Sequence, residues 1–296
     1  MKISIIGSNG FLSTAIARYC NERGWKIDVY GLVAPLNHQY DRFYYIDLMK
    51  DNVDVHNLLD STMVIYAAGA GIQSNRRDDT SMIFRLNVGV PVNICNELKK
   101  NSFEGIMITF GSYFEIGEIN SHRAFTEEEI LSSISPAPNE YVISKRMFSC
   151  FVSSYKHPFR HWHFYLPTIY GEGENPIRLI PYTINSIRSN NPIKYTSGFQ
   201  TRQYIYVNDL PDLLFLSVDK NLPSGVYNVP GKETLTVREI VTLIHLYFER
   251  DVPENCFGAE QRDDVGMSYL ALNCEKLTKL TGFSPSTCLK DVIKLY

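Results

Sequence analysis

The stretch that decides the fold of this chain reads Lys2-Ile3-Ser4-Ile5-Ile6-Gly7-Ser8-Asn9-Gly10-Phe11-Leu12-Ser13. Residues 2–6 predict a fully buried strand, because three isoleucines leave little polar surface. Glycines at the strand-to-helix turn that follows let the backbone turn sharply and approach a pyrophosphate closely. A helix predicted over residues 11–23, ended by Gly24, would offer that anion its free N–H groups and positive dipole end. The stretch predicts a dinucleotide-binding unit, with a tight turn that merely needs glycine as the alternative. The residues expected at the dinucleotide are Gly7, Ser8, Asn9, Gly10, Phe11 and Leu12.

Outward from this unit, short apolar runs alternate with amphipathic segments, a pattern typical of βαβ units around a parallel sheet. Further strands are expected at residues 25–30, 43–46, 63–67, 105–110 and 161–166, and helices at 81–100 and 139–155. After Gly171 this rhythm is lost, and a capping box at Thr236 and Glu239 opens another helix. The sequence predicts an α/β fold, a Rossmann-type doubly wound parallel sheet with a smaller C-terminal α/β lobe. The expected boundaries are 1–170 for the sheet domain, with 204–235 packing back onto it, and 171–203 plus 236–296 for the lobe.

Composition excludes several classes of function. The 296 residues carry 29 Lys and Arg against 32 Asp and Glu, a net charge of −3, which does not favour nucleic acid or an anionic membrane as partner. No apolar run approaches the roughly 18 residues of a membrane helix, and the N-terminus does not resemble a signal peptide. Six scattered cysteines predict neither a disulfide framework nor a zinc site, so a reducing cytoplasm is expected. We also expect no metal at His157, His161 and His163, because no carboxylate or cysteine stands near them in sequence.

The second predicted strand bears on which dinucleotide binds. An acid at its tip would hold the adenosine ribose hydroxyls of NAD, but Asp28 lies inside the strand and the tip carries no acid. This absence favours NADP(H), with Lys26 and Arg42 as candidate cations for the 2′-phosphate, and leaves NAD open. Asp47, after the third strand, is expected near the adenine amino group, with a solvated turn as the alternative.

A tyrosine and a lysine four residues apart suggest proton transfer. Of 19 tyrosines only Tyr141 is followed by lysine at this spacing, which places Lys145 on the same helical face. A neighbouring ammonium lowers the pKa of a phenol, so Tyr141 is expected to exchange a proton with a sugar oxygen. Ser112 follows the fifth strand at the edge where ligands bind such sheets, and its hydroxyl would help to fix that oxygen.

Several short motifs follow one another along nearly the whole chain. They are Gly7-x-x-Gly10, Asp47-Leu48, Ala67-Ala68, Asn87-Val88, Ser112, Tyr141-x-x-x-Lys145, Pro167-Thr168-Ile169-Tyr170-Gly171, Gln200-x-Arg202-x-Tyr204-Ile205-Tyr206-Val207-x-Asp209 and Tyr227-Asn228-Val229. In their order and spacing the chain resembles the extended short-chain dehydrogenase/reductases, specifically the nucleotide-sugar epimerase/dehydratase group. This resemblance implies a Rossmann domain with bound NAD(P) and a C-terminal lobe that binds a nucleoside-diphosphate sugar. It also implies deoxysugar or bacterial surface polysaccharide synthesis, and a homodimer formed through residues 81–100 and 139–155.

The resemblance assigns roles residue by residue. Ser112, Tyr141 and Lys145 would be the catalytic trio. The cofactor site would include Asp47, Leu48, Ala67, Ala68, Gly69, Asn87, Pro167, Thr168 and Ile169. Arg202 and Arg262 would pair with the substrate diphosphate, although a surface ion pair is the alternative for either arginine. Tyr113, Asn175, Arg178 and Leu179 would border the substrate. Gln203 and Tyr165 depart from the family's usual Asp and Arg.

The resemblance also narrows the reaction. The 4,6-dehydratases of this group follow the catalytic hydroxyl with Asp-Glu, where this chain has Tyr113 and Phe114. The 3,5-epimerase-reductases carry a cysteine at the place of Phe114. What remains is reduction of a 4-keto nucleotide sugar, which we favour, or 4-epimerisation with retained NAD. A non-catalytic NAD(P)-sensing protein on the same fold is a third hypothesis.

Overall fold

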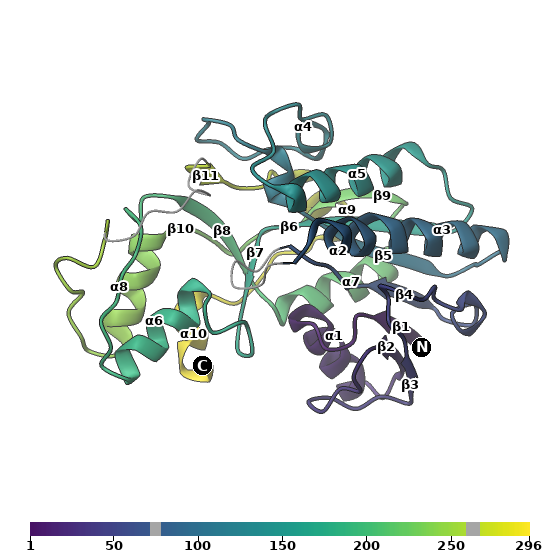
Figure 1. The fold of residues 1–296 in the computed structure, drawn as a ribbon, viewed down its shortest axis with the longest axis horizontal. Coiled ribbons are helices and arrows are strands. Elements are labelled where there is room, and N and C mark those ends of the chain that lie inside the picture. The colour runs from purple at the N-terminus through teal and green to yellow at the C-terminus, as the bar shows by residue number, and fades with distance from the viewer. Residues whose placement is uncertain (72–77, 259–266) are drawn as a thin grey trace.

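The computed structural model describes residues 1–71, 78–258 and 267–296 (Figure 1). Its main sheet has seven strands: β1 (Lys2–Ile6), β2 (Lys26–Gly31), β3 (Arg42–Tyr45), β4 (Met63–Tyr66), β5 (Ile106–Ser112), β6 (Arg160–Leu166) and β9 (Gly225–Asn228). They lie in the order β3-β2-β1-β4-β5-β6-β9, and every neighbouring pair is parallel. The first six strands have the order of a dinucleotide-binding sheet, so the predicted Rossmann-type fold is confirmed.

Helices cover both faces of this sheet (Figure 1). They include α1 (Phe11–Glu22), α2 (Thr80–Phe84), α3 (Val90–Lys100), α4 (Glu127–Leu131), α5 (Glu140–Ser154), α7 (Asp209–Asp219) and α9 (Glu275–Thr281). Alternate residues of β4 show the two faces: Met63 and Ile65 pack in the cluster that includes α1 and α7, whereas Val64 and Tyr66 pack in the cluster that includes α3. Within the described ranges, no helix is both long and apolar enough to cross a bilayer.

The helix expected over 81–100 is interrupted. Between α2 and α3 the chain forms a π-helical turn, Arg85–Gly89, which contains the buried Asn87. Pro91 follows one residue into α3 and has no N–H to donate to the carbonyl of Asn87 four residues earlier. The proline ring also crowds that carbonyl, so the wider turn is the physical consequence.

A second sheet forms the smaller lobe, to the left in Figure 1. It contains β7 (Thr168–Tyr170), β8 (Thr201–Tyr206), β10 (Glu233–Thr236) and β11 (Tyr269–Leu270), with helices α6 (Leu179–Arg188), α8 (Val237–Tyr247) and α10 (Leu289–Val292). The segment 204–235, placed with the main sheet from the sequence, is divided. α7 and β9 lie with the main sheet, whereas β8 and β10 pair with each other in the second sheet.

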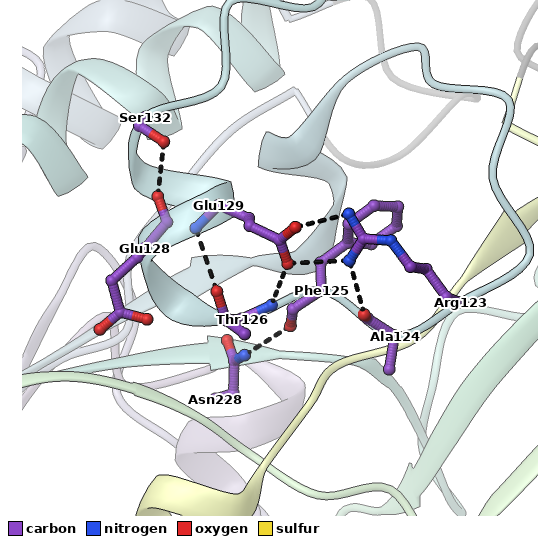
Figure 2. Close-up of polar contacts among 8 residues, drawn as sticks. All are labelled: Arg123, Ala124, Phe125, Thr126, Glu128, Glu129, Ser132 and Asn228. Atoms are coloured by element: carbon purple, nitrogen blue, oxygen red, sulfur yellow. Dashed lines mark hydrogen bonds and ion pairs between the residues drawn. The ribbon is translucent and has the colours of Figure 1, made fainter.

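The acidic run of residues 127–129 begins α4, and its three glutamates have different surroundings. Figure 2 shows Thr126 and Glu129 capping α4, with both Glu129 oxygens bound by Arg123. The hydrogen bonds from Arg123 lower the pKa of Glu129 to about 2. Glu127, by contrast, is buried and accepts a hydrogen bond from the backbone of Asn228 at 2.8 Å. This contact, together with the bond from the Asn228 side chain to Phe125 O, ties α4 to the main sheet.

Candidate active site

A cavity of about 310 Å³ opens where the carboxyl ends of β1, β4, β5 and β6 meet, beside the smaller lobe. Most residues predicted from the sequence line it together. They are Gly10, Phe11, Leu12, Ala67, Ala68, Gly69, Asn87, Ser112, Tyr113, Tyr141, Lys145, Pro167, Thr168, Ile169 and Arg178. Such an edge is where ligands bind in sheets of this order.

The turn after β1 has the features of a pyrophosphate cradle. Gly7 has φ of +94°, and a Cβ there would lie 2.6 Å from the backbone N of Ala68, so only glycine fits. Gly10 is the N-cap of α1 and provides no side-chain hydrogen bond, which leaves the first N–H groups of the helix for a ligand. The hydroxyl of Ser8 is buried without a protein partner in this same turn. These features fit the phosphates of a dinucleotide.

Ser112 ends β5 and caps the short 3-10 helix Tyr113–Ile116. Its Oγ accepts a hydrogen bond from Phe114 N at 3.3 Å, and its own N–H donates to Glu115 Oε1 at 2.7 Å. The oxygen of Ser112 is thereby fixed, and a hydrogen bond between its side chain and that of Tyr141 acts to lower the pKa of the phenol.

Tyr141 and Lys145 lie one turn apart on α5. The ammonium of Lys145 donates to Phe110 O at 2.9 Å and lies 5.8 Å from the centroid of the Tyr141 ring. Burial raises the pKa of Tyr141, and the nearby carboxylate of Glu115 adds to this effect. Burial also lowers the pKa of Lys145. The expected lowering of the Tyr141 pKa by the ammonium is therefore not found, because desolvation outweighs the other influences.

Asn87 was expected to contact the cofactor, but its amide bonds the protein itself. Its Oδ1 accepts from Ala70 N and its Nδ2 donates to Ala70 O, both at 3.0 Å. The same Nδ2 donates to Ser144 Oγ at 2.9 Å, between Tyr141 and Lys145 in sequence. Asn87 thus fastens the loop after β4 to α5, and it also lines the cavity.

The substrate residues expected from the sequence are partly assembled. Arg178 reaches the cavity and forms an ion pair with the buried Glu174 at 3.2 Å. Tyr113 OH lies 2.5 Å from Thr168 Oγ1. The guanidinium of Arg202 lies 6.0 Å from the ring of Phe114, which itself lines the cavity.

Other expected residues do not line this cavity. Leu179 is the first residue of α6, and Asn175 precedes it in the chain. Gly7, Ser8 and Asn9 form the turn that leads to Gly10. Asp47 pairs with Lys50 at 3.0 Å, beside Leu48, in the loop after β3. Arg262 lies outside the residues that the structure describes.

The cations proposed for a 2′-phosphate are wrongly placed. Lys26 and Arg42 begin β2 and β3, and parallel strands begin at the edge opposite the cavity. The loop beyond the β2 tip instead brings His38 to the turn after β1, and it contacts Arg18, which lies further along α1. Arg18 Nε donates to Asn37 O at 3.3 Å, and His38 Nε2 lies 3.3 Å from Ser8 O. These two basic residues were missed because their proximity depends on the path of the loop.

Glu115 is a further residue of this region that was not expected from the sequence. Its side chain is fully buried, and besides Ser112 N it binds Ser149 Oγ at 2.5 Å. Burial raises the pKa of Glu115 to about 7. The pattern Ser-x-x-Glu at 112–115 is a capping box and was the signal that could have identified it.

Comparisons with known proteins agree with this geometry. A family model described as the NAD dependent epimerase/dehydratase family matches residues 3–230. CDP-abequose synthase of Salmonella muenchen is 24% identical over 99% of this chain and 96% of its own length. The dTDP-glucose 4,6-dehydratase of Escherichia coli is 26% identical over 88% of this chain and 81% of its own.

Among solved structures, the UDP-glucose 4-epimerase of Thermus thermophilus in complex with NAD superposes with a TM-score of 0.82. That match covers 100% of this chain and 97% of the epimerase at 18% identity, a likeness of fold. The names of these similar proteins describe different reactions, so the chemistry must be argued from the cavity itself.

Proposed function

The chain belongs to the NAD-dependent epimerase/dehydratase family, and on this premise we propose that it reduces the 4-keto group of a nucleoside-diphosphate sugar, a 6-deoxyhexose, with NADP(H) as hydride donor. The reaction adds one hydride to the carbonyl carbon and one proton to its oxygen. It breaks only the π bond of the carbonyl, cleaves no carbon–oxygen single bond and removes no proton from carbon.

One observation carries the proposal. Among the described residues that line the cavity there is no Asp, Glu, His or Cys, so no carboxylate, imidazole or thiolate is available to take a proton from a ring carbon. The polar side chains suited to bind or protonate a carbonyl oxygen are the hydroxyls of Ser112 and Tyr141 and the ammonium of Lys145. Hydride transfer with proton donation to oxygen requires no more than these.

The states of these side chains favour reduction. The raised pKa keeps Tyr141 protonated at neutral pH, as a proton donor must be. Ser112, its oxygen fixed by Phe114 N–H, donates a hydrogen bond that orients the carbonyl oxygen. Lys145 stabilises the phenolate that remains after Tyr141 has given up its proton. When bound, a nicotinamide cofactor supplies the hydride.

The positions of basic side chains are the basis on which we propose the substrate's diphosphate and the cofactor's 2′-phosphate. Arg178 at the cavity wall and Arg202 behind Phe114 are suited to the diphosphate of the substrate. No acid occurs between residues 31 and 40, a loop that contains His38 and is contacted by Arg18 of α1, and this supports a 2′-phosphate and therefore NADP(H).

The deciding experiment begins with the cofactor. Purified protein is denatured, any released dinucleotide is identified by mass, and the stripped protein is titrated with NAD, NADH, NADP and NADPH. We expect an empty site that prefers NADPH, and NADPH-dependent reduction of 4-keto-6-deoxy nucleotide sugars. Retained NAD with interconversion of sugar epimers in the absence of added cofactor would overturn the reductase in favour of a 4-epimerase.

The assembly is part of the same proposal. We propose a homodimer through α3 and α5, because Ile143 and Met147 present exposed apolar side chains one turn apart on α5. Met147→Glu is expected to give monomers in sedimentation equilibrium, and a wild-type protein that is itself monomeric at micromolar concentration contradicts this arrangement.

A further inference from the structure

A second group of chemically reactive side chains gathers near the start of β6, away from the carboxyl edge of the sheet. Cys95 comes from α3, His157 from the segment between α5 and β6, and His161 from β6 itself. One sulfur or nitrogen atom of each lies within 4.8 Å of those of the other two. The sequence places no cysteine beside these histidines, and the fold supplies one that lies 62 residues before His157.

The histidines of this cluster lack hydrogen-bond partners. Both ring nitrogens of His157 and Nδ1 of His161 are buried and have no hydrogen-bond partner in the protein. His161 as a whole is only 2% exposed. A buried polar atom without a partner destabilises the folded protein, because it has lost its hydrogen bonds to water and gained none in return. Such atoms beside a thiol call for an explanation, and a missing ligand provides one.

A chain of hydrogen bonds determines which nitrogen of His161 carries the lone pair. When Glu115 is ionised, Ser149 donates its hydroxyl proton to the carboxylate, so His163 Nε2, 3.0 Å from Ser149 Oγ, is the donor of that pair. His163 Nδ1 then accepts from Thr109 Oγ1 at 2.8 Å. The oxygen of Thr109 in turn accepts from His161 Nε2 at 2.9 Å. The lone pair of His161 therefore lies on Nδ1, the atom without a partner, and a metal-binding histidine is oriented in this way by its other nitrogen.

We propose that Cys95 Sγ, His157 and His161 Nδ1 bind a divalent transition metal ion of the Zn²⁺ class, with a fourth position for water. One thiolate and two imidazoles are ligands that such ions prefer. With metal–sulfur and metal–nitrogen bonds of about 2.3 and 2.0 Å, the three atoms must approach to about 3.5 Å of one another. Binding releases the thiol proton of Cys95 to solvent.

The surroundings allow an ion to enter. A second cavity, of about 430 Å³, is lined by His157 and His161 and lies between the end of α5 and β9. Lys99 opposes a cation near His157, and the thiolate of Cys95 offsets that charge once the ion is bound. The ion would tie α3 to the segment before β6. This position is away from the carboxyl edge of the sheet, where Tyr141 lines the first cavity.

The test uses the full chain after treatment with a chelator. Zn²⁺ is titrated in competition with a chromophoric chelator, and Co²⁺ is added separately to detect thiolate-to-cobalt absorption in the near ultraviolet. We expect one ion per chain and a cobalt–thiolate band. Cys95→Ser should abolish the band, and His157→Gln should weaken Zn²⁺ binding by more than the roughly 10–100-fold lost with an outer-shell partner.

Matched controls separate this site from adventitious binding. Cys150 and His56 are exposed elsewhere, so Cys150→Ser and His56→Gln should leave affinity and spectrum unchanged. Absence of stoichiometric binding, or binding that is unaffected by His157→Gln, overturns the proposal. If Cys95→Ser does not fold, His157→Gln and the wild-type cobalt spectrum still decide it, because His157 is only half-buried. None of these readouts depends on the proposed reductase activity.

Discussion

The buried carboxyl group of Glu115 provides a prediction about stability and pH. Its pKa rises from 4.5 to about 7 on folding because the side chain is removed from water. The native state therefore binds more protons than the unfolded state between these two values, and the free energy of unfolding falls as pH rises. At 1.36 kcal/mol per pKa unit, the shift corresponds to about 3 kcal/mol that is lost by about pH 8.

Glu115→Gln removes this titration and keeps an acceptor for Ser112 N–H. We expect the difference in unfolding free energy between wild type and variant to change by about 3 kcal/mol from pH 4.5 to about pH 8, in the direction that favours the variant at high pH. Urea unfolding followed by tryptophan fluorescence at constant ionic strength measures it. Burial lowers the pKa of His163 to about 3, so this residue contributes an opposite pH dependence to the free energy of unfolding. The contribution is common to wild type and variant, and it cancels when one free energy is subtracted from the other.

Glu128→Gln is the matched control, because Glu128 is an exposed glutamate on α4 whose side chain is 75% accessible. Its unfolding free energy should run parallel to that of wild type across the same range. If the Glu115→Gln curve is also parallel to wild type, Glu115 does not ionise in the native state as argued, and the reasoning from burial fails.

Four further predictions concern the cavity. Gly7→Ala should weaken NADPH binding by more than about tenfold in a fluorescence titration, because its Cβ would lie 2.6 Å from Ala68 N; Gly24→Ala, also at positive φ but with open space around it, is the control and should leave affinity unchanged. Asn87→Ala should lower the free energy of unfolding by about 2–4 kcal/mol, since it leaves the Ala70 backbone unpaired in a buried site, and a loss below 1 kcal/mol in urea unfolding would count against this clamp. Tyr141→Phe should reduce turnover by about 10²–10⁴-fold with ligand affinities retained, whereas a sensing protein would show no difference. Arg18→Glu should shift the ratio of NADPH to NADH affinity toward NADH, and an unchanged ratio would show that Arg18 lies away from the 2′-phosphate.

The order of elements was predictable because it depends on local signals. Buried apolar runs, the glycines at 7, 10 and 24, and the capping box at Thr236 each report on a few neighbouring residues. The sequence also indicated which side chains would meet at the carboxyl edge, since the ends of parallel strands lie together whatever the loops do.

What the sequence did not reveal depends on contacts between distant segments. The apolar pattern of residues 81–100 indicates one continuous helix, and it hides the π-helical turn at Arg85–Gly89. That turn follows from Pro91, which cannot donate a hydrogen bond to the carbonyl of Asn87. The pKa of Tyr141 was predicted in the wrong direction, because spacing shows a nearby ammonium but not the extent of burial. The approach of Cys95 to His157 is set by how α3 packs on the sheet, which no local pattern describes.

The arrangement around Ser112 explains why a nearby acid does not change the proposed chemistry. Glu115 stands only three residues from Ser112 and has a pKa of about 7, which would suit a general base. Its two oxygens, however, are bound by Ser112 N and Ser149 Oγ, and it is absent from the described residues that line the cavity. The residues after Ser112 that line the cavity are Tyr113 and Phe114, whose rings carry no carboxylate. Elimination therefore lacks a base at the sugar even though an acid with a suitable pKa lies one turn away, and proton donation to oxygen remains the chemistry that the cavity supports.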